Sequence, residues 1–195
     1  MLHGGVVAAM GTFFVFSDYM KPAVRIAALM QVPVKLIWTH DAFRVGEDGP
    51  THEPVEQEAQ IRLMEKLKNH AGKDSVRVFR PADADETTVC WKLAMENVET
   101  PTALIFSRQG ISKLPEGTDY EQAAKGAYIV AGSDENPDVI LVASGSEVST
   151  LEAGCEALRA DGIKVRVVSA PSEGLFRGQS KEYQESVLPK NAKIF

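Results

Sequence analysis

The sequence has little of what marks a secreted, a membrane or a nucleic-acid-binding protein. Only two of its 195 residues are cysteines, Cys90 and Cys155, and they stand singly, without a metal-type spacing. This usage favours a reducing compartment, so we expect buried thiols and a cytoplasmic location. The chain has no lysine or arginine cluster, and its formal net charge is -6. We therefore expect neither nucleic acid nor a membrane among its partners.

Long hydrophobic runs are missing as well. The apolar opening from Gly4 to Phe16 is too short to span a bilayer, and no Lys or Arg precedes it as in a signal peptide. The chain also has no internal repeat. Its composition is that of a globular protein, with 44% hydrophobic and 25% charged residues. This is enough material for one large or two small domains.

Helical and strand-like patterns alternate along the chain, which predicts an α/β fold with mainly parallel sheets. In the first part we expect helices from about Val6 to Phe16, Pro22 to Met30, Val55 to Asn69 and from the Asp83 region to about Asn97, with strands at Val34 to Thr39, Ser75 to Phe79 and Ala103 to Phe106. The fourth helix begins with Asp83, Asp85 and Glu86, whose negative charge suits a helix amino terminus.

The pattern weakens from Ile111 to Lys125, and we place a domain boundary near Gly117. The predicted domains are residues 1–117 and 118–195. In the second domain we expect strands at Ala127 to Val130, Val139 to Ala143 and Val165 to Ser169, with a helix from about Glu147 to Asp161 between the last two. These form a right-handed βαβ unit. The final residues from Ala192 to Phe195 predict the beginning of a further strand, and both chain ends look cut within longer elements.

The loop from Thr39 to Pro54 is the most informative segment. It contains two histidines and four carboxylates, punctuated by glycine and proline. It follows a predicted strand, so its polar groups should emerge at the strand's carboxyl end, where open α/β sheets bind ligands. The residue types alone leave three readings open: a catalytic loop, a metal site without a familiar ligand spacing, and turn-forming polar groups.

Three motifs resemble the transketolase family, in the order in which they occur there. They are Thr12 to Tyr19, the loop with His40-Asp41 and Gly46 to His52, and Ser107-Arg108-Gln109; Val168 to Ser172 and Glu185 to Pro189 extend the likeness. The resemblance implies a thiamine-diphosphate enzyme of the pentose phosphate pathway, which moves a two-carbon ketol unit between sugar phosphates and works as a homodimer. It also implies two consecutive three-layer α/β domains, a partial pyrimidine-binding domain and a truncated carboxy-terminal domain.

The resemblance assigns Phe13, Phe16 and Tyr19, together with His52, to the pocket around the cofactor's aminopyrimidine ring. Flat heteroaromatic rings stack well on aromatic faces. If Phe13, Phe16 and Tyr19 belong to one helix, their spacing of three places them on one side. Without the resemblance, the same spacing would indicate ordinary core packing.

The loop residues His40, Asp48 and His52 match positions that face the sugars. The resemblance makes His40 and His52 candidates for proton transfer, a role that suits an imidazole, and Asp48 a partner for a sugar hydroxyl. Arg108 matches an arginine that grips the terminal phosphate, as a planar cationic fork can, and Ser107 assists it. No residue of the chain is assigned as a metal ligand.

The family binds the cofactor's diphosphate and Mg or Ca through an earlier domain, which this chain does not contain. The chain also lacks the position of the glutamate that activates the aminopyrimidine. We therefore expect the isolated chain to bind no cofactor and to be inactive. Two alternatives stay open: a natural split subunit that needs a separate amino-terminal chain, and a metal-dependent hydrolase or isomerase using the loop from His40 to His52. The activity of a related thiamine enzyme, dihydroxyacetone synthase, also stays open.

Overall fold

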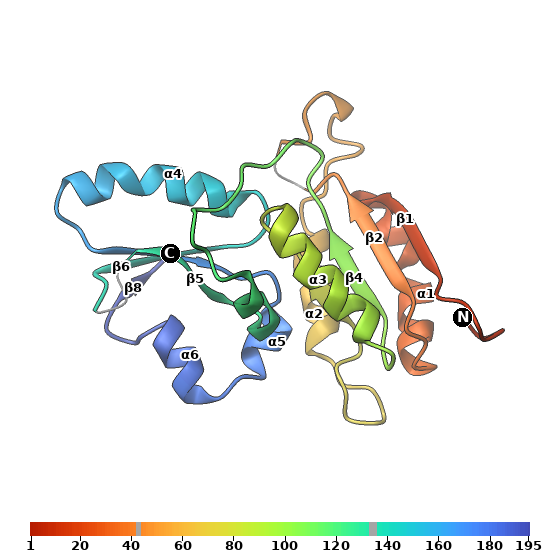
Figure 1. Ribbon diagram of the computed structural model, residues 1–195. Helices are drawn as coiled ribbons and strands as arrows, with labels where there is room; N and C mark the ends of the chain where they lie inside the picture. Colours follow the sequence, from red (N-terminus) through yellow and green to blue (C-terminus); the bar gives the residue numbers. More distant parts are fainter. Residues whose placement is uncertain (42–43, 133–135) are drawn as a thin grey trace. The chain divides into compact units, whose positions relative to one another are not determined.

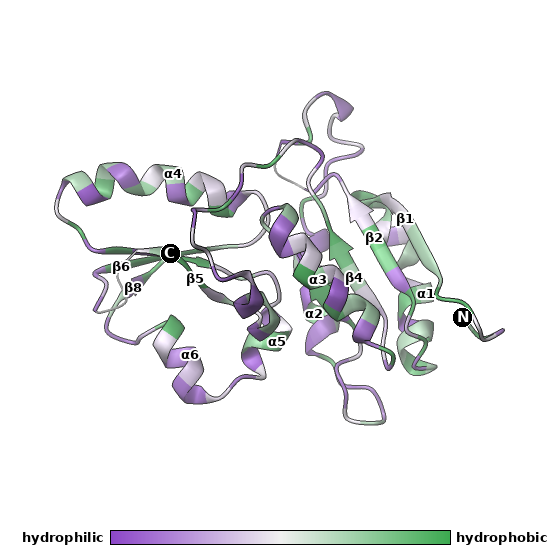
Figure 2. Ribbon diagram, in the orientation of Figure 1, coloured by the Kyte–Doolittle hydropathy of each residue, from purple (hydrophilic) through white to green (hydrophobic). Residues whose placement is uncertain are grey.

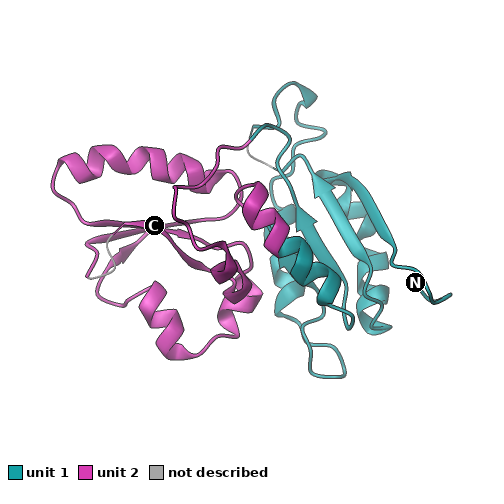
Figure 3. Cartoon of the chain, in the orientation of Figure 1, with its two compact units in different colours: residues 1–80, 90–110 teal, residues 81–89, 111–195 magenta. Residues whose placement is uncertain are grey.

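The structure, a computed structural model, describes residues 1–41, 44–132 and 136–195 (Figure 1). The chain forms two compact units (Figure 3). Unit 1 comprises Met1–Arg80 and Cys90–Gly110, and unit 2 comprises Pro81–Val89 and Ile111–Phe195. The domain limits 1–117 and 118–195 stay a prediction.

Unit 1 is built on a four-stranded parallel sheet in the order β1-β2-β4-β3. Its strands are β1 (Ala9–Phe13), β2 (Lys35–Thr39), β3 (Arg77–Phe79) and β4 (Thr102–Ile105); its helices are α1 (Ser17–Leu29), α2 (Gln57–Lys66) and most of α3 (Ala84–Glu96). The crossovers through α1 and α2 run in one direction across the sheet and the crossover through α3 runs back. Right-handed connections therefore put α3 on the face opposite α1 and α2 (Figure 1).

The core of unit 1 lies between the sheet and helices α1 and α2. It contains Phe14, Val24, Leu36, Trp38, Ile61, Val76, Val78, Ala103 and Ile105. All four residues of β4 are buried, and the strand is hydrophobic over most of its length (Figure 2). A central parallel strand covered on both faces needs such a continuous apolar run.

Unit 2 is built on a second four-stranded sheet, in the order β5-β7-β6-β8. Its elements are the 3-10 helix η3 (Tyr120–Lys125), β5 (Tyr128–Gly132), β6 (Val139–Ala143), α4 (Glu147–Ala160), β7 (Val165–Ser169), α5 (Glu173–Arg177), α6 (Lys181–Val187) and β8 (Lys193–Ile194). β6, β7 and β8 run parallel, whereas β5 pairs antiparallel with β7. Helices α4 and α6 lie on opposite faces of this sheet (Figure 1). The predicted three-layer α/β fold with mainly parallel sheets is confirmed.

The predicted helix from Val6 to Phe16 is wrong. Residues Ala9–Phe13 form β1, the 3-10 turn η1 (Phe14–Phe16) follows, and α1 begins at Ser17, which precedes the predicted start at Pro22. The small residues of this segment suggested a helix. Pairing with β2 in register, from Ala9 with Lys35 to Phe13 with Thr39, overrides that preference.

The other predicted helices and strands are present, with ends that differ by a few residues. Patterns did not predict the short helices α5 and α6. The second of these is capped by Ser180, whose hydroxyl accepts a hydrogen bond from the Tyr183 amide at 3.2 Å. Among the described residues, no helix is long and apolar enough to cross a membrane.

Candidate active site

The candidate site residues lie where three neighbouring strands of unit 1 end. Phe13 is the last residue of β1, His40 directly follows β2, and Arg108 stands three residues after β4. Because these strands are parallel, their carboxyl ends meet at one edge of the sheet, the usual ligand-binding edge of such folds. The predicted loop after β2 is confirmed; Ala42 and Phe43 within it lie outside the described residues.

Aromatic rings form the apolar part of the site. The His40 ring stacks on Phe13 with 3.8 Å between centroids. The His52 ring meets Phe16 edge-on at 5.3 Å and Phe13 at 5.8 Å. Tyr19 continues the row, 6.2 Å from Phe16, and is 83% exposed. The structure thus brings together the five rings predicted for cofactor and sugar contacts.

The reason for this clustering differs from the one predicted. Phe13 ends a strand, Phe16 ends a 3-10 turn, and Tyr19 lies in the first turn of α1. These three residues therefore do not form a stripe on one helix. The turn from strand to helix directs the rings to a common place, where the loop after β2 supplies both histidines.

Polar groups converge on Asp48, which belongs to the 3-10 turn η2 (Gly46–Asp48). His40 Nε2 lies 3.7 Å from Asp48 Oδ2, and Arg108 Nε lies 3.4 Å from the same oxygen. Arg108 also pairs with Glu47. Asp48 Oδ2 is buried, yet it accepts no hydrogen bond within the described part of the chain. It is therefore an acceptor at which a hydroxyl group could donate.

Two threonines hold the histidine rings. Thr39 Oγ1 lies 3.0 Å from His40 Nδ1, and Thr51 Oγ1 lies 2.8 Å from His52 Nδ1. With Nδ1 engaged, the Nε2 atom of each ring is the one left for a ligand. Beside Tyr19, a hydrogen bond from Lys21 holds the pKa of Asp18 below its usual value, against the opposing effect of burial.

Sequence reasoning gave no role to Asp41, Arg80 or Gln109. Asp41, the residue after His40, forms a buried ion pair with Arg80. Both polar atoms of the Gln109 side chain are buried and have no hydrogen-bond partner among the described residues. The sequence signal for all three was weak, since Gln109 merely adjoins Arg108 in the motif and the Asp41–Arg80 contact joins distant segments.

No metal site accompanies these residues in the described ranges, where no group of three or more His, Cys, Asp or Glu side chains could hold a metal ion. The loop histidines instead contact aromatic rings and threonine hydroxyls. The metal-dependent alternative stays an untested prediction.

Comparisons with known proteins identify the family of the chain. Residues 1–113 match the family described as "Transketolase, pyrimidine binding domain", and residues 126–195 match "Transketolase-like TK C-terminal domain". The chain is 50% identical to a transketolase of Halalkalibacterium halodurans over 192 residues, which are 97% of this chain and 28% of that protein. It is 48% identical to the Bacillus subtilis transketolase, covering 98% of this chain and 28% of the relative.

Solved structures give the same result. The transketolase of Leishmania mexicana superposes with a TM-score of 0.88 at 38% identity, over 98% of this chain and 27% of that one. A structure titled "Split gene transketolase, inactive beta4 tetramer" matches with a TM-score of 0.69 at 27% identity, over 89% of this chain and 52% of that one. The chain thus spans about 28% of the curated relatives it matches. Because a family match covers more than half of its residues, the chain belongs to the transketolase family.

Proposed function

We propose that this chain is part of a thiamine-diphosphate-dependent transketolase, which transfers a two-carbon ketol unit between sugar phosphates. The observation that carries the proposal is the convergence of all seven predicted site residues within unit 1. Phe13, Phe16, Tyr19, His40 and His52 share ring contacts, and Asp48 joins His40 to Arg108. These residues come from segments up to 95 positions apart, from Phe13 to Arg108.

The aromatic residues suit the pyrimidine end of the cofactor. Phe13 and Phe16 are half-buried, so each ring keeps an accessible part for contact with a second flat ring. Thiamine diphosphate, when bound, supplies a nucleophilic carbon for attack on a ketose carbonyl. Phe13, Phe16, Tyr19 and His52 would surround and orient the pyrimidine. For the diphosphate and its Mg or Ca, we assign no ligand in this chain.

The polar residues suit a sugar phosphate. Asp48 accepts a hydrogen bond from a sugar hydroxyl through its buried Oδ2 atom, and the His40 and His52 Nε2 atoms exchange protons with the hydroxyls beside the reacting carbons. Arg108 binds the terminal phosphate with its guanidinium fork. In the structure this fork pairs with Glu47, which is 75% exposed in its side chain, so a phosphate can replace that carboxylate at little cost.

The remainder of the enzyme should supply the diphosphate-binding domain and the activating glutamate, so we expect this chain alone to be inactive. In the assembled enzyme we propose a homodimer that acts in the pentose phosphate pathway of the cytoplasm.

The test is to join this chain to the remaining part of the Halalkalibacterium halodurans transketolase, in place of the matching 192 residues. With thiamine diphosphate, magnesium and sugar phosphates, the hybrid should transfer ketol units, whereas the 195-residue chain should not. The complete Halalkalibacterium enzyme is the positive control. A folded, dimeric hybrid without activity beside an active control would overturn the proposal, and turnover by the chain alone would refute its inactivity.

A split subunit is the second candidate, favoured by the match to a chain titled as part of a split gene transketolase. In that case this chain should form a complex with a separately produced amino-terminal part, and mixing the two should restore ketol transfer. Size-exclusion chromatography and the same assay decide this. Activity in the fused hybrid but neither complex nor activity after mixing would argue for a single continuous chain.

A further inference from the structure

We propose that Asp41, Arg80 and Ser107 form a positioning device that sets His40 and Arg108 for sugar-phosphate binding. This inference rests on the proposed function of His40 and Arg108. None of the three residues needs to touch the substrate. They act by fixing the backbone and side chains beside the two residues that do.

The contacts converge on one carboxylate oxygen. Arg80 donates to Asp41 Oδ2 through Nη2 at 2.7 Å and through Nε at 3.0 Å. The Ser107 hydroxyl donates to the same oxygen at 3.0 Å. The Asp41 amide also donates to the Phe106 carbonyl at 3.3 Å. Asp41 follows β2, Arg80 follows β3 and Phe106-Ser107 follow β4, so the contacts tie three neighbouring strand ends together.

Burial makes this connection stiff. The side chains of Asp41 and Arg80 are 1% and 6% exposed. Behind them the ion pairs continue, since Arg80 Nε lies 3.7 Å from Glu58, and Arg62 lies 3.4 Å from Glu58 and 3.8 Å from Glu65. The chain of alternating charges reaches α2, whose Glu65 accepts a hydrogen bond from the Val78 amide. Buried ion pairs with several hydrogen bonds favour one geometry over others.

The residue that this network holds is His40, whose backbone is strained. His40 has a φ of 59°, in the left-handed region that non-glycine residues rarely adopt. Such a conformation persists when the surrounding structure fixes it, and it is concentrated at functional sites. Asp41, the next residue, supplies that fixation. The turn at His40 places its ring on Phe13 and its Nε2 atom towards Asp48.

Ser107 extends the same control to Arg108. Its hydroxyl anchors the segment after β4 to Asp41. The side chain of the next residue, Arg108, pairs with Glu47 and Asp48. The loop is therefore held at its start by Asp41 and at its middle by Arg108. Loss of the Ser107 hydroxyl should loosen both substrate-facing residues while leaving the Asp41–Arg80 pair in place.

Ser107→Ala is the main test because it removes one hydrogen bond and keeps the buried ion pair. The first readout uses the 195-residue chain, in which diethylpyrocarbonate modifies histidines at rates that follow their local freedom. The rate at His40, relative to the exposed His70, should rise about three- to tenfold, the range that corresponds to the net contribution of one typical intramolecular hydrogen bond. Asp41→Asn should raise it further, and Ser107→Thr, which keeps the hydroxyl, should restore it.

The second readout is kinetic and uses the hybrid enzyme. Ser107→Ala should lower kcat/KM for sugar phosphates about tenfold, since small misplacements of binding groups are costly in rate. Ser75→Ala is the matched control, because its hydroxyl donates to the Met64 carbonyl at 2.6 Å in the same unit, away from the loop. It should leave both readouts unchanged.

The inference would be overturned if Ser107→Ala and Ser75→Ala had equal effects. It would also be overturned if neither Ser107→Ala nor Asp41→Asn changed the modification rate at His40. An inactive unmodified hybrid would count against the proposed function instead, and the His40 rates would still decide whether the device exists.

Discussion

Glu47 shows how a single exposed residue can tune a binding site. It pairs with Arg108, the proposed phosphate-binding residue, and so competes with substrate. In the hybrid enzyme, Glu47→Gln should lower KM for a phosphorylated sugar by about threefold, because an exposed ion pair is worth about 0.2–1 kcal/mol. Steady-state kinetics with the phosphorylated and the unphosphorylated form of one sugar measure this.

Glu53→Gln is the control for that prediction, since Glu53 is an exposed carboxylate of the same loop. It should leave both KM values unchanged. The role of Glu47 would be contradicted by an equal change of KM for the two sugar forms, because only the phosphorylated one engages Arg108.

Glu86 in unit 2 is a buried carboxylate with a perturbed titration. It accepts hydrogen bonds from the Ala82 amide and from the hydroxyls of Tyr128 and Ser169, at 2.5, 2.8 and 2.7 Å. Burial nevertheless outweighs these bonds and raises its pKa above the ordinary 4.5. The folded state thus binds this proton more tightly than the unfolded state does, and its contribution to the free energy of unfolding falls as pH rises from 4.5 through the folded-state pKa.

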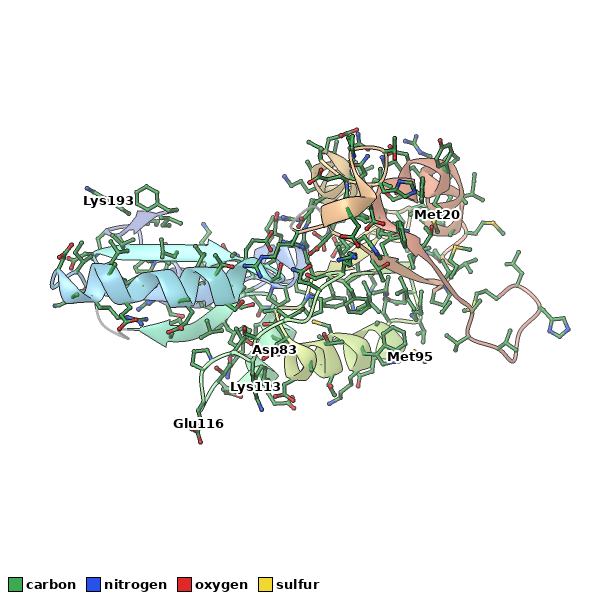
Figure 4. The ribbon with its side chains drawn as sticks, turned by 90° about the horizontal axis from the view of Figure 1, so that it is seen from above. Met20, Asp83, Met95, Lys113, Glu116 and Lys193 are labelled. Atoms are coloured by element: carbon green, nitrogen blue, oxygen red, sulfur yellow. The ribbon has the colours of Figure 1, made fainter. Side chains whose placement is uncertain are left out.

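Glu86→Gln should remove this contribution. Urea unfolding at a series of pH values should show the wild-type chain losing stability relative to the Glu86→Gln variant as pH rises above 4.5. Glu116→Gln, at the exposed position labelled in Figure 4, should follow the wild type at every pH. A stability difference between wild type and Glu86→Gln that stays constant with pH would refute the assignment.

At the scale of elements, one glycine decides how the turn before β5 packs on α5. Gly126 ends η3 with a φ of 91°, and a Cβ there would lie 2.3 Å from both the Phe176 amide nitrogen and the Ser172 carbonyl oxygen. Gly126→Ala therefore combines backbone strain with a clash against backbone atoms, and should destabilise unit 2 by more than about 2 kcal/mol. Thermal or urea unfolding measures the loss.

Gly117→Ala separates the two effects. Gly117 also has a positive φ, 87°, but a Cβ there would meet nothing within 4 Å. Gly117→Ala should therefore lower the free energy of unfolding only through backbone strain, by about 1 kcal/mol. Similar losses for both variants would show that the close approach of α5 is unimportant.

The β1 segment shows where local patterns fail at this scale. Its small and apolar residues are compatible with a helix, and its last residue, Phe13, was expected in a helix that ends at about Phe16. Neighbouring strand β2 supplies the hydrogen-bonding partners that make it a strand. The rings of Phe13, Phe16 and Tyr19 still cluster, because β1 and α1 meet at the 3-10 turn η1.

At the scale of the whole molecule, an apolar surface on unit 1 should govern how the isolated chain behaves. Val6, Val7 and Met10 are 59%, 58% and 47% exposed, and Ile26 and Leu29 of α1 are 53% and 57% exposed. Within the described residues β1 pairs only with β2, so its outer edge offers backbone groups beside this surface. Exposed edges with apolar neighbours favour pairing with a second copy.

We therefore expect reversible, concentration-dependent self-association of the chain, measured by sedimentation velocity. Met10→Lys combined with Ile26→Lys should shift it towards the monomer. Leu63→Lys, at a similarly exposed position (62%) on α2, should not. A chain that sediments as a monomer at all concentrations would contradict this expectation, and equal effects of both variants would assign the contact elsewhere.

The α/β class, most of the helices and strands, and the candidate residues of the site could be predicted from the sequence alone. Periodicity and motif spacing are local properties, and His40, Asp48, His52 and Arg108 stand in recognisable motifs. Three features became clear only in the folded chain. β1 is a strand, the rings of Phe13, Phe16 and Tyr19 cluster at the turn between β1 and α1, and Asp41 pairs with Arg80. The physical reason is that strand pairing and buried ion pairs join residues far apart along the chain, 39 positions for Asp41 and Arg80, and no local pattern encodes which of them become neighbours.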